Sequence, residues 1–322
     1  MRPRKVSIVL PTHNGMPLFS RVLDGILAQR CSFPFELYCV DTASADGTWE
    51  ELERRNVRRK RIAKSEFDHG RTRNQAISET DGDVIVCMVQ DATPADEHWL
   101  EALVSAYDAI DDVAGAYSRQ VPYPDCSPFL KHRLERWAAG RTERQIQRLA
   151  PGESLAQLEP MQRLFRCAFD DVASSMRREV WRRFPLPSRR FGEDVAWAKS
   201  VIEAGLALVF EPRSTVIHSH DDGAWAEAKR IYLDHANLHD LFGVLTVPTF
   251  ADARRNSRAQ FGVYRAQVDA LDLPPRERDA QLRFARRLAY GETFAQWLGA
   301  RSVRKGPPRG IFRWIEHLVT GK

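Results

Sequence analysis

Four acidic residues lie where predicted strands end or a predicted helix begins, positions at which side chains can meet a ligand. Asp41 ends the apolar run FELYCV, and Asp91 follows the apolar run VIVCMVQ. Glu193 and Asp194 open the segment GEDVAWAKSVIEAG. A carboxylate binds hard cations such as Mg²⁺ or Mn²⁺ and can take the proton of an attacking hydroxyl. Each of the four could instead cap the turn or helix that follows it.

The stretch EFDHGRTRNQA, residues 66–76, concentrates charge at the predicted start of a helix that continues to Glu79. A helix N-terminus offers unpaired N–H groups and the positive end of the helix dipole to an anion. Arg71 and Arg73 beside it would suit a phosphate-bearing ligand, and Asp68 could lock an arginine. The alternative is a solvated loop with ordinary surface arginines.

The first third of the chain alternates strand and helix patterns. Apolar runs at 5–10, 35–40 and 83–89 predict strands, and residues 16–30 have the apolar spacing of a helix. This alternation predicts an open, mostly parallel α/β sheet flanked by helices. The loops PTHNG, DTASADGT and QDATP then lie at the carboxyl ends of the strands, the edge where such sheets bind ligands.

The pattern is looser further along the chain. Residues 118–128 read as a loop, 129–150 as a basic helical stretch and 206–221 as two short strands around a proline turn. Residues 168–187 read as a strand and a short helix, and 191–205 as a helix. From residue 223 onward the chain reads as all helical. We therefore expect a main domain at 1–222 and a basic helical C-terminal extension at 223–322.

Composition excludes several classes of protein. The 322 residues are 43% hydrophobic and 28% charged, as in a globular protein, and no apolar run approaches a membrane span. Residues 251–322 hold 15 Lys and Arg against 7 Asp and Glu, a net +8, whereas the remainder holds 33 against 36, a net −3. A nearly neutral main body argues against nucleic-acid binding, and the basic tail would suit an anionic membrane surface. Neither G-x-G-x-x-G nor a P-loop is present.

The cysteines and the N-terminus indicate the compartment. The five cysteines are odd in number and widely spaced, with no C-x-x-C pair. That pattern argues against a disulfide framework or a zinc cage and favours a reducing cytosol. The N-terminal apolar run is too short for a signal peptide and reads as a first strand.

Five motifs in order resemble the family 2 inverting glycosyltransferases, which have the GT-A nucleotide-sugar fold. They are VSIVLPTHNG, VDTASADGT, HGRTRNQAI, QDA and GEDVAWAKSVIEAG, over about residues 5–222. The forms FDHGRTRN, QDA and HSH look most like the rhamnosyltransferase branch. Many relatives carry two aspartates in the metal motif, whereas this chain has Gln90-Asp91-Ala92 and keeps one carboxylate.

The resemblance implies a role for each candidate residue. Asp194 would be the general base and Glu193 would orient the acceptor or an arginine. Asp91 and His220 would bind Mg²⁺ or Mn²⁺, with His218 on the same face of a predicted strand; a structural role for both histidines stays open. The implied nucleotide-sugar site comprises Pro11, Thr12, His13, Asn14, Asp41, Asp68, Arg71, Arg73 and Gln90.

We therefore predict a metal-assisted inverting glycosyltransferase that is cytoplasmic or peripheral on the inner face of the membrane. The implied donor is dTDP-rhamnose, and the implied acceptor is a hydroxyl of a glycan or lipid-linked glycan. One alternative is a sugar-phosphate nucleotidyltransferase, but PTHNG lacks the Gly-rich, basic loop expected after its first strand. The other is a non-enzymatic module whose basic tail binds membranes or nucleic acid.

Overall fold

The computed structural model describes residues 5–108, 110–219 and 223–304, together with Gly310, Arg313 and His317. Its strands are β1 (Val6–Thr12), β2 (Phe35–Thr42), β3 (Arg58–Ile62), β4 (Val84–Met88), β5 (Thr93–Pro94), β6 (Val113–Val121), β7 (Gln145–Gln147), β8 (Ala173–Arg177) and β9 (Ala207–Ile217). Its α-helices are α1 (Leu18–Leu27), α2 (Thr48–Arg54), α3 (His69–Ser78), α4 (Trp99–Val104), α5 (Pro128–Arg136), α6 (Pro160–Arg166), α7 (Arg178–Arg183), α8 (Glu193–Glu203), α9 (Ala224–Phe242), α10 (Phe250–Asp269) and α11 (Pro275–Arg304).

Within the described ranges the strands form one nine-stranded sheet in the order β3-β2-β1-β4-β8-β6-β9-β5, with β7 also paired to β9. The block β3-β2-β1-β4 is parallel, as the strand–helix alternation predicts. Beyond it the sheet is mixed, because β8 runs antiparallel to both β4 and β6, whereas β6 and β9 are parallel. The carboxyl ends of β1, β2 and β4 therefore share one edge with the carboxyl ends of β6 and β9.

Two segments differ from the sequence prediction. The predicted loop 118–128 begins inside β6, and the two predicted strands around Pro212 are one strand, β9. The pairing of β9 with β6 jumps from Ser118↔Glu211 to Arg119↔Thr215, so the residues after Glu211 bulge out of the ladder. A bulge accepts a proline, which has no N–H to donate to the sheet.

The basic helix predicted over 129–150 is also shorter than expected. Helix α5 ends at Arg136, and residues 145–147 form β7 against β9. The Gln147 amide donates to the carbonyls of Phe165 and Ala168 at 3.1 and 2.8 Å, which fastens this edge strand. Pairing with the sheet therefore outweighs the helical preference of this segment.

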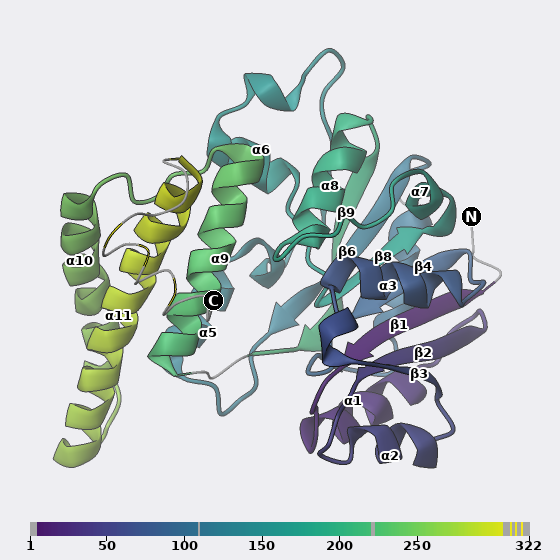
Figure 1. Ribbon diagram of the computed structural model, residues 1–322, viewed down its shortest axis with the longest axis horizontal. Helices are drawn as coiled ribbons and strands as arrows, with labels where there is room; N and C mark the ends of the chain where they lie inside the picture. Colours follow the sequence, from purple (N-terminus) through teal and green to yellow (C-terminus); the bar gives the residue numbers. More distant parts are fainter. Residues whose placement is uncertain are drawn as a thin grey trace. The chain divides into compact units, whose positions relative to one another are not determined.

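The parallel block is sandwiched between helices because its strands are apolar on both faces. Alternate residues of β1, namely Val6, Ile8 and Leu10, join one core cluster with Phe19 and Leu23 of α1. Helices α1 and α2 lie on one side of β1, β2 and β3, and α3 lies on the other (Figure 1). This packing fixes the loops that leave the strand ends.

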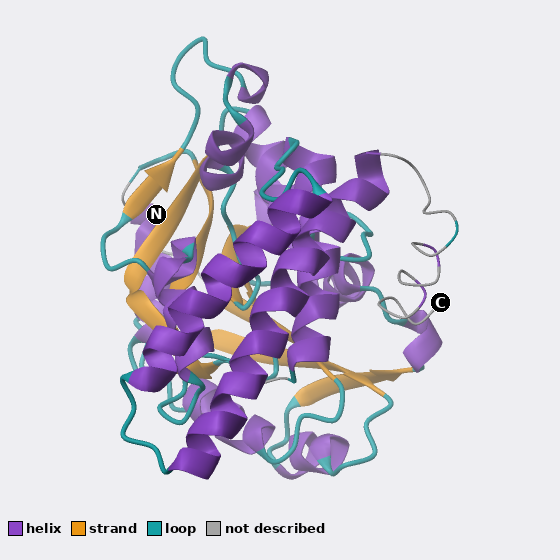
Figure 2. Ribbon diagram, turned by 90° about the vertical axis from the view of Figure 1, so that its left-hand side faces the viewer, coloured by secondary structure: helices purple, strands orange, loops and turns teal. Residues whose placement is uncertain are grey.

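The chain divides into two compact units. One comprises Met1–Asp125, Arg133–Gln157 and Phe165–Ser219; the other comprises Cys126–His132, Leu158–Leu164 and His220–Lys322. In the second unit, the long helix α11 packs along both α9 and α10 (Figures 1 and 2). Gly299 of α11 allows this, since a Cβ there would lie 2.4 Å from the carbonyl oxygen of Tyr232 in α9. None of the helices in the described ranges combines the length and apolar character needed to cross a membrane.

Candidate active site

One glutamine holds the loop after β1 against the loop after β4. Gln90 Oε1 accepts a hydrogen bond from the backbone N–H of His13 at 2.7 Å, and Gln90 Nε2 donates to the carbonyl of His13 at 3.0 Å. Gly15 allows the approach, because a Cβ there would lie 2.9 Å from Gln90 Oε1. We expected Gln90 to bind the donor. Instead, both the oxygen and the nitrogen of its amide bond the backbone of His13, which holds together the loops after β1 and β4.

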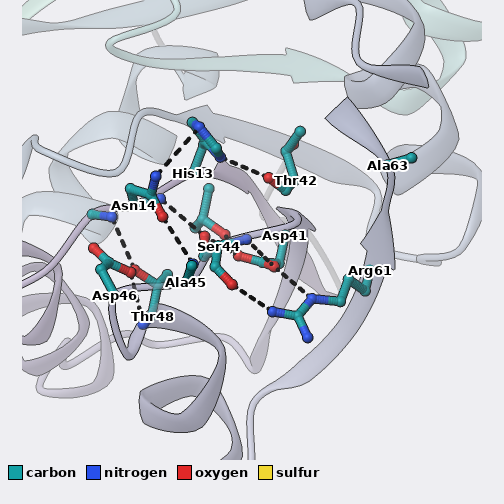
Figure 3. A network of polar contacts seen from close by, with 12 residues as sticks. His13, Asn14, Asp41, Thr42, Ser44, Ala45, Asp46, Thr48, Arg61 and Ala63 are labelled. Carbon is teal, nitrogen blue, oxygen red and sulfur yellow. Dashed lines mark hydrogen bonds and ion pairs between the residues drawn. The ribbon is translucent and has the colours of Figure 1, made fainter. Parts of the chain in front are cut away.

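Asp41 lies beside Thr12 in the register of β1 and β2 and is fully buried. Its carboxylate accepts hydrogen bonds from Thr12 Oγ1 at 3.1 Å, the backbone N–H of Ser44 at 3.1 Å and Arg61 Nε at 3.2 Å. Ser44 Oγ in turn accepts from the backbone N–H of Asn14 at 2.9 Å (Figure 3). The carboxylate therefore organises the turn after β2 and links it to the loop that follows β1.

An arginine that the sequence analysis missed completes this network. Arg61 Nη2 donates to the Ser44 carbonyl at 2.6 Å, and its guanidinium lies 4.8 Å from the centre of the Trp49 ring. Arg59 lies over the same ring at 4.7 Å. Both arginines belong to β3, whose sequence RRKRI shows no apolar alternation, so neither the strand nor this cation–π cluster could be predicted.

The stretch FDHGRTRN fastens the segment that leads to Glu193 and Asp194. Asp68 caps α3 through the backbone N–H of Arg71 at 2.8 Å and also accepts from Ser188 Oγ at 2.6 Å. The Asn74 amide donates to the Leu186 carbonyl at 2.7 Å and accepts from the Leu186 N–H at 3.1 Å. The concentration of polar groups at this helix start therefore has a structural use, which is to hold residues 186–188.

Arg71 and Arg73, both predicted to face a diphosphate, have different surroundings. Arg71 is exposed, and its guanidinium donates to the Glu66 carbonyl at 3.0 Å. Arg73 is 3% exposed and donates to Glu193 Oε1 at 2.6 Å, with Asp171 Oδ2 3.5 Å from its Nε. The guanidinium of Arg73 therefore neutralises buried carboxylates, and Glu193 is bound to an arginine.

Asp194 lies in a cluster of acids. Its Oδ2 accepts a hydrogen bond from the backbone N–H of Asp171 at 3.2 Å, and its Oδ1 accepts from the N–H of Val195 at 2.7 Å. Burial and the nearby negative charges, Glu193 first and Asp171 next, raise the pKa of Asp194 well above its usual range. Burial also raises the pKa of Asp171, to about 6. A carboxylate with raised proton affinity is a better general base near neutral pH.

Asp91 and His218 lie together at the same edge of the sheet. Asp91 Oδ1 is 3.6 Å from His218 Nε2, and Tyr123 Oη donates to the Asp91 carbonyl at 3.3 Å. A carboxylate oxygen and an imidazole nitrogen on facing loops are donors that suit a divalent cation such as Mn²⁺. His220, also predicted as a metal ligand, lies outside the described residues. Among the residues that are described, no group of three His, Cys, Asp or Glu side chains is arranged to hold a metal.

Two further acids and a glutamine connect these parts and were not predicted. Asp170 and Asp171 are separated from β8 by Val172, and the first residue of β8 pairs with the last residue of β4. Gln120 near the end of β6 donates to Asp170 Oδ2 at 2.6 Å. The pair of aspartates in AFDDVASS was visible in the sequence, but its place beside Asp194 depends on antiparallel pairing that no local pattern indicates.

The sheet and its flanking helices have the fold of the GT-A glycosyltransferases. A structure of glucosyl-3-phosphoglycerate synthase from Mycobacterium tuberculosis, in complex with Mn²⁺, uridine diphosphate and glucosyl-3-phosphoglycerate, aligns with a TM-score of 0.54 at 15% identity. The alignment covers 75% of this chain and 81% of that one and supports the shared fold. The model of glycosyl transferase family 2 matches residues 7–170, and the chain belongs to that family.

Two curated relatives refine the comparison. The chain is 28% identical over 239 residues to the O-antigen chain rhamnosyltransferase RfbN of Salmonella typhimurium, covering 73% of this chain and 72% of the relative. It is 26% identical over 237 residues to the O-antigen chain rhamnosyltransferase WbaN of Salmonella anatum, covering 72% and 71%. The protein is therefore a glycosyltransferase, similar in sequence to these two rhamnosyltransferases, rather than a sugar-phosphate nucleotidyltransferase or a non-enzymatic module.

Proposed function

We propose that the protein transfers L-rhamnose from dTDP-rhamnose to a hydroxyl of a glycan or lipid-linked glycan, with inversion at the anomeric carbon. The observation that carries the proposal is the position of Asp194 among buried carboxylates that raise its pKa. The similarity to two O-antigen chain rhamnosyltransferases supports the choice of sugar and of acceptor class.

In the proposed reaction Asp194 takes the proton of the acceptor hydroxyl while that oxygen attacks the anomeric carbon. The attack comes from the face opposite the leaving nucleoside diphosphate, so the configuration inverts. Glu193 and Arg73 hold the start of α8 through their 2.6 Å ion pair and thereby orient Asp194. The hydrogen bonds of Asn74 and Asp68 to residues 186–188 hold the segment that leads to Asp194.

The donor would bind along the edge formed by the loops after β1, β2 and β4. Pro11, Thr12, His13 and Asn14 would contact the base, and the hydrogen bonds of Asp41 to Thr12 and Arg61 would hold these loops in place. Arg71, exposed at the start of α3, is available to the diphosphate. Asp91 and His218 would hold a divalent cation. When bound, that cation neutralises charge on the departing diphosphate.

Donor screening tests this proposal. We expect dTDP and Mn²⁺ together to raise the melting temperature, because a ligand that binds only the native state stabilises it by about 2.7 kcal/mol at 100 times its Kd. We expect release of dTDP from dTDP-L-rhamnose to exceed release of the nucleoside diphosphate from UDP-glucose or GDP-mannose. Equal release from all three donors, or stabilisation by none of the nucleotides, would overturn the assignment of the donor.

A further inference from the structure

His218 is held between two side chains from different strand ends. Its Nε2 lies 3.6 Å from Asp91 Oδ1, and its Nδ1 lies 3.0 Å from Gln120 Oε1. His218 and Gln120 are buried, with 6% and 5% of their surfaces exposed. Both ring nitrogens therefore have a defined neighbour, and the tautomer of the ring depends on which of these neighbours can accept a hydrogen bond.

The amide of Gln120 has one orientation that satisfies its surroundings. Asp170 Oδ2 is 2.6 Å from Gln120 Nε2, and Asp170 Oδ1 accepts from the backbone N–H of Val172 at 2.9 Å. Gln120 Nε2 is the donor in this contact with Asp170 Oδ2, so the NH₂ end of the amide faces Asp170. The carbonyl end then faces His218, and the hydrogen bond requires the proton on Nδ1.

We propose that Asp170 and Gln120 are positioning residues that fix His218 in the Nδ1–H tautomer, so that Nε2 presents its lone pair toward Asp91. The inference rests on the proposed metal-assisted function, because an Nε2 lone pair and the Asp91 carboxylate would both be available as ligands to a cation. Outer partners of metal-binding histidines commonly set the tautomer in this way.

The same segment connects the proposed metal site with the general base. Asp170 orients Gln120 through its side chain, and the next residue, Asp171, donates its backbone N–H to Asp194 Oδ2 at 3.2 Å. The dipeptide Asp170-Asp171 thus contacts Gln120, which is bonded to His218, and also contacts Asp194. The backbone of residues 170–171 therefore links the proposed metal site to the proposed general base.

The tautomer can be observed directly without metal or substrate. In protein labelled with ¹⁵N-histidine at pH 8, two-bond ¹H–¹⁵N correlations distinguish the protonated from the unprotonated ring nitrogen. We expect His218 to carry its proton on Nδ1 in the wild type and to lose this preference in Gln120→Met. A wild-type His218 protonated on Nε2, or on both nitrogens, would overturn the proposal.

An exchange of donor and acceptor tests the role of each partner. Gln120→Glu places two carboxylates face to face, and we expect the Kd for Mn²⁺, measured by calorimetry, to rise about 10- to 100-fold. Adding Asp170→Asn supplies an amide that can donate to the introduced carboxylate and still accept from the N–H of Val172. The double variant should therefore recover most of the affinity, whereas residues with only a packing role would show no such recovery.

Controls separate this proposal from the proposed function. Gln145→Glu on β7 makes the same chemical change at a side chain whose amide donates to the Glu143 carbonyl at 3.4 Å, and should leave the Kd unchanged. If the wild type bound no Mn²⁺ yet showed the Nδ1–H tautomer, the metal-assisted function would fail while the positioning role stood. A double variant no better than Gln120→Glu would contradict the positioning role.

Discussion

The charged residues around Asp194 affect its pKa in different ways. Burial raises the pKa of Asp194, and the negative charges of Glu193 and Asp171 raise it further, while Arg73, ion-paired with both acids, keeps the cluster from being wholly acidic. An arginine in such a position maintains its own charge because the attraction of Asp171 and Glu193 outweighs the cost of burial. The part of the proton affinity of Asp194 that comes from charge is therefore due to named neighbours, which can be changed one at a time.

Removing one of those neighbours should move the pH profile. In Asp171→Asn a negative charge beside Asp194 disappears, so the ionised base becomes easier to form and its pKa falls. Because activity is lost as pH drops through that pKa, the acid limb of kcat/KM should move to lower pH. The limb is measured from pH 5 to 9 with a constant ionic strength; a limb that stayed in place or moved to higher pH would contradict the assigned charge effect.

The two arginines of α3 should differ in their effect on stability. Arg73→Met leaves Glu193 without its buried partner, and breaking one side of a buried ion pair costs about 3–5 kcal/mol. Arg71→Met is the matched control two residues away, where the side chain is exposed and the change should stay within about 0.5 kcal/mol. Urea unfolding followed by circular dichroism measures both. Similar losses for the two variants would contradict the buried ion-pair role of Arg73.

At the level of elements, hydrogen bonds join the start of α3 to the segment 186–188. Asp68, Gly70 and Asn74 each contact or approach that segment, and α8 with Asp194 follows it directly. The motif FDHGRTRN, whose sequence suggests a phosphate site, therefore holds residues 186–188, the segment that leads to Asp194. Arg71, on the exposed side of the same turn, keeps the ligand-facing role as a prediction.

Gly70 makes this contact possible. A Cβ on Gly70 would lie 2.1 Å from the Pro187 carbonyl oxygen, so Gly70→Ala must displace the segment and should destabilise the fold by about 1–3 kcal/mol. Turnover should fall with it, since Asp194 follows within a few residues. Gly262→Ala in α10 is the control: apart from the adjacent backbone of the helix, no atom of the described residues lies within 4 Å of a Cβ placed there, and the free energy of unfolding should rise by about 0.5–1 kcal/mol. Thermal melts measure the stability of both variants. An unchanged melting temperature for Gly70→Ala would contradict the close approach of Gly70 to Pro187.

The parts of the fold that the sequence predicts are those with strong local patterns. The apolar runs of β1, β2 and β4 and the apolar spacing of α1 identify the parallel block and its ligand edge. Strand β3 is too charged to be recognised, and β7 becomes a strand only because β9 offers it an edge. The partners of Asp194 and His218 come from β6 and from the residues before β8, so they depend on long-range pairing that no short segment encodes.

At the scale of the whole molecule, charge is distributed unevenly along the chain. The net +8 of residues 251–322 contrasts with the near-neutral remainder. In the described part of this region, several arginines of α10 and α11 are exposed, among them Arg254, Arg258, Arg283 and Arg287. Exposed basic side chains are attracted to anionic lipid surfaces by about 1 kcal/mol each when they lie near the surface. This supports the proposal of a peripheral contact with the inner face of a membrane, where a lipid-linked acceptor would reside.

Vesicle binding tests that contact. We expect the full chain to sediment with vesicles containing phosphatidylglycerol and to be released as NaCl is raised from 50 to 500 mM, because salt screens exposed charges. Vesicles of phosphatidylcholine alone serve as the control and should bind little protein. Equal binding to both, or binding that is insensitive to salt, would contradict an electrostatic attachment.

The most direct test of the account is the comparison of wild type with Asp194→Asn. Asparagine keeps the size of the side chain but cannot take a proton, and general bases contribute about 10²- to 10⁴-fold to rate. With Mn²⁺ and dTDP-L-rhamnose, we expect release of dTDP to fall by at least about 100-fold while the Kd for dTDP changes by less than about twofold. Normal release by Asp194→Asn would contradict the assignment of Asp194 as the base that drives sugar transfer.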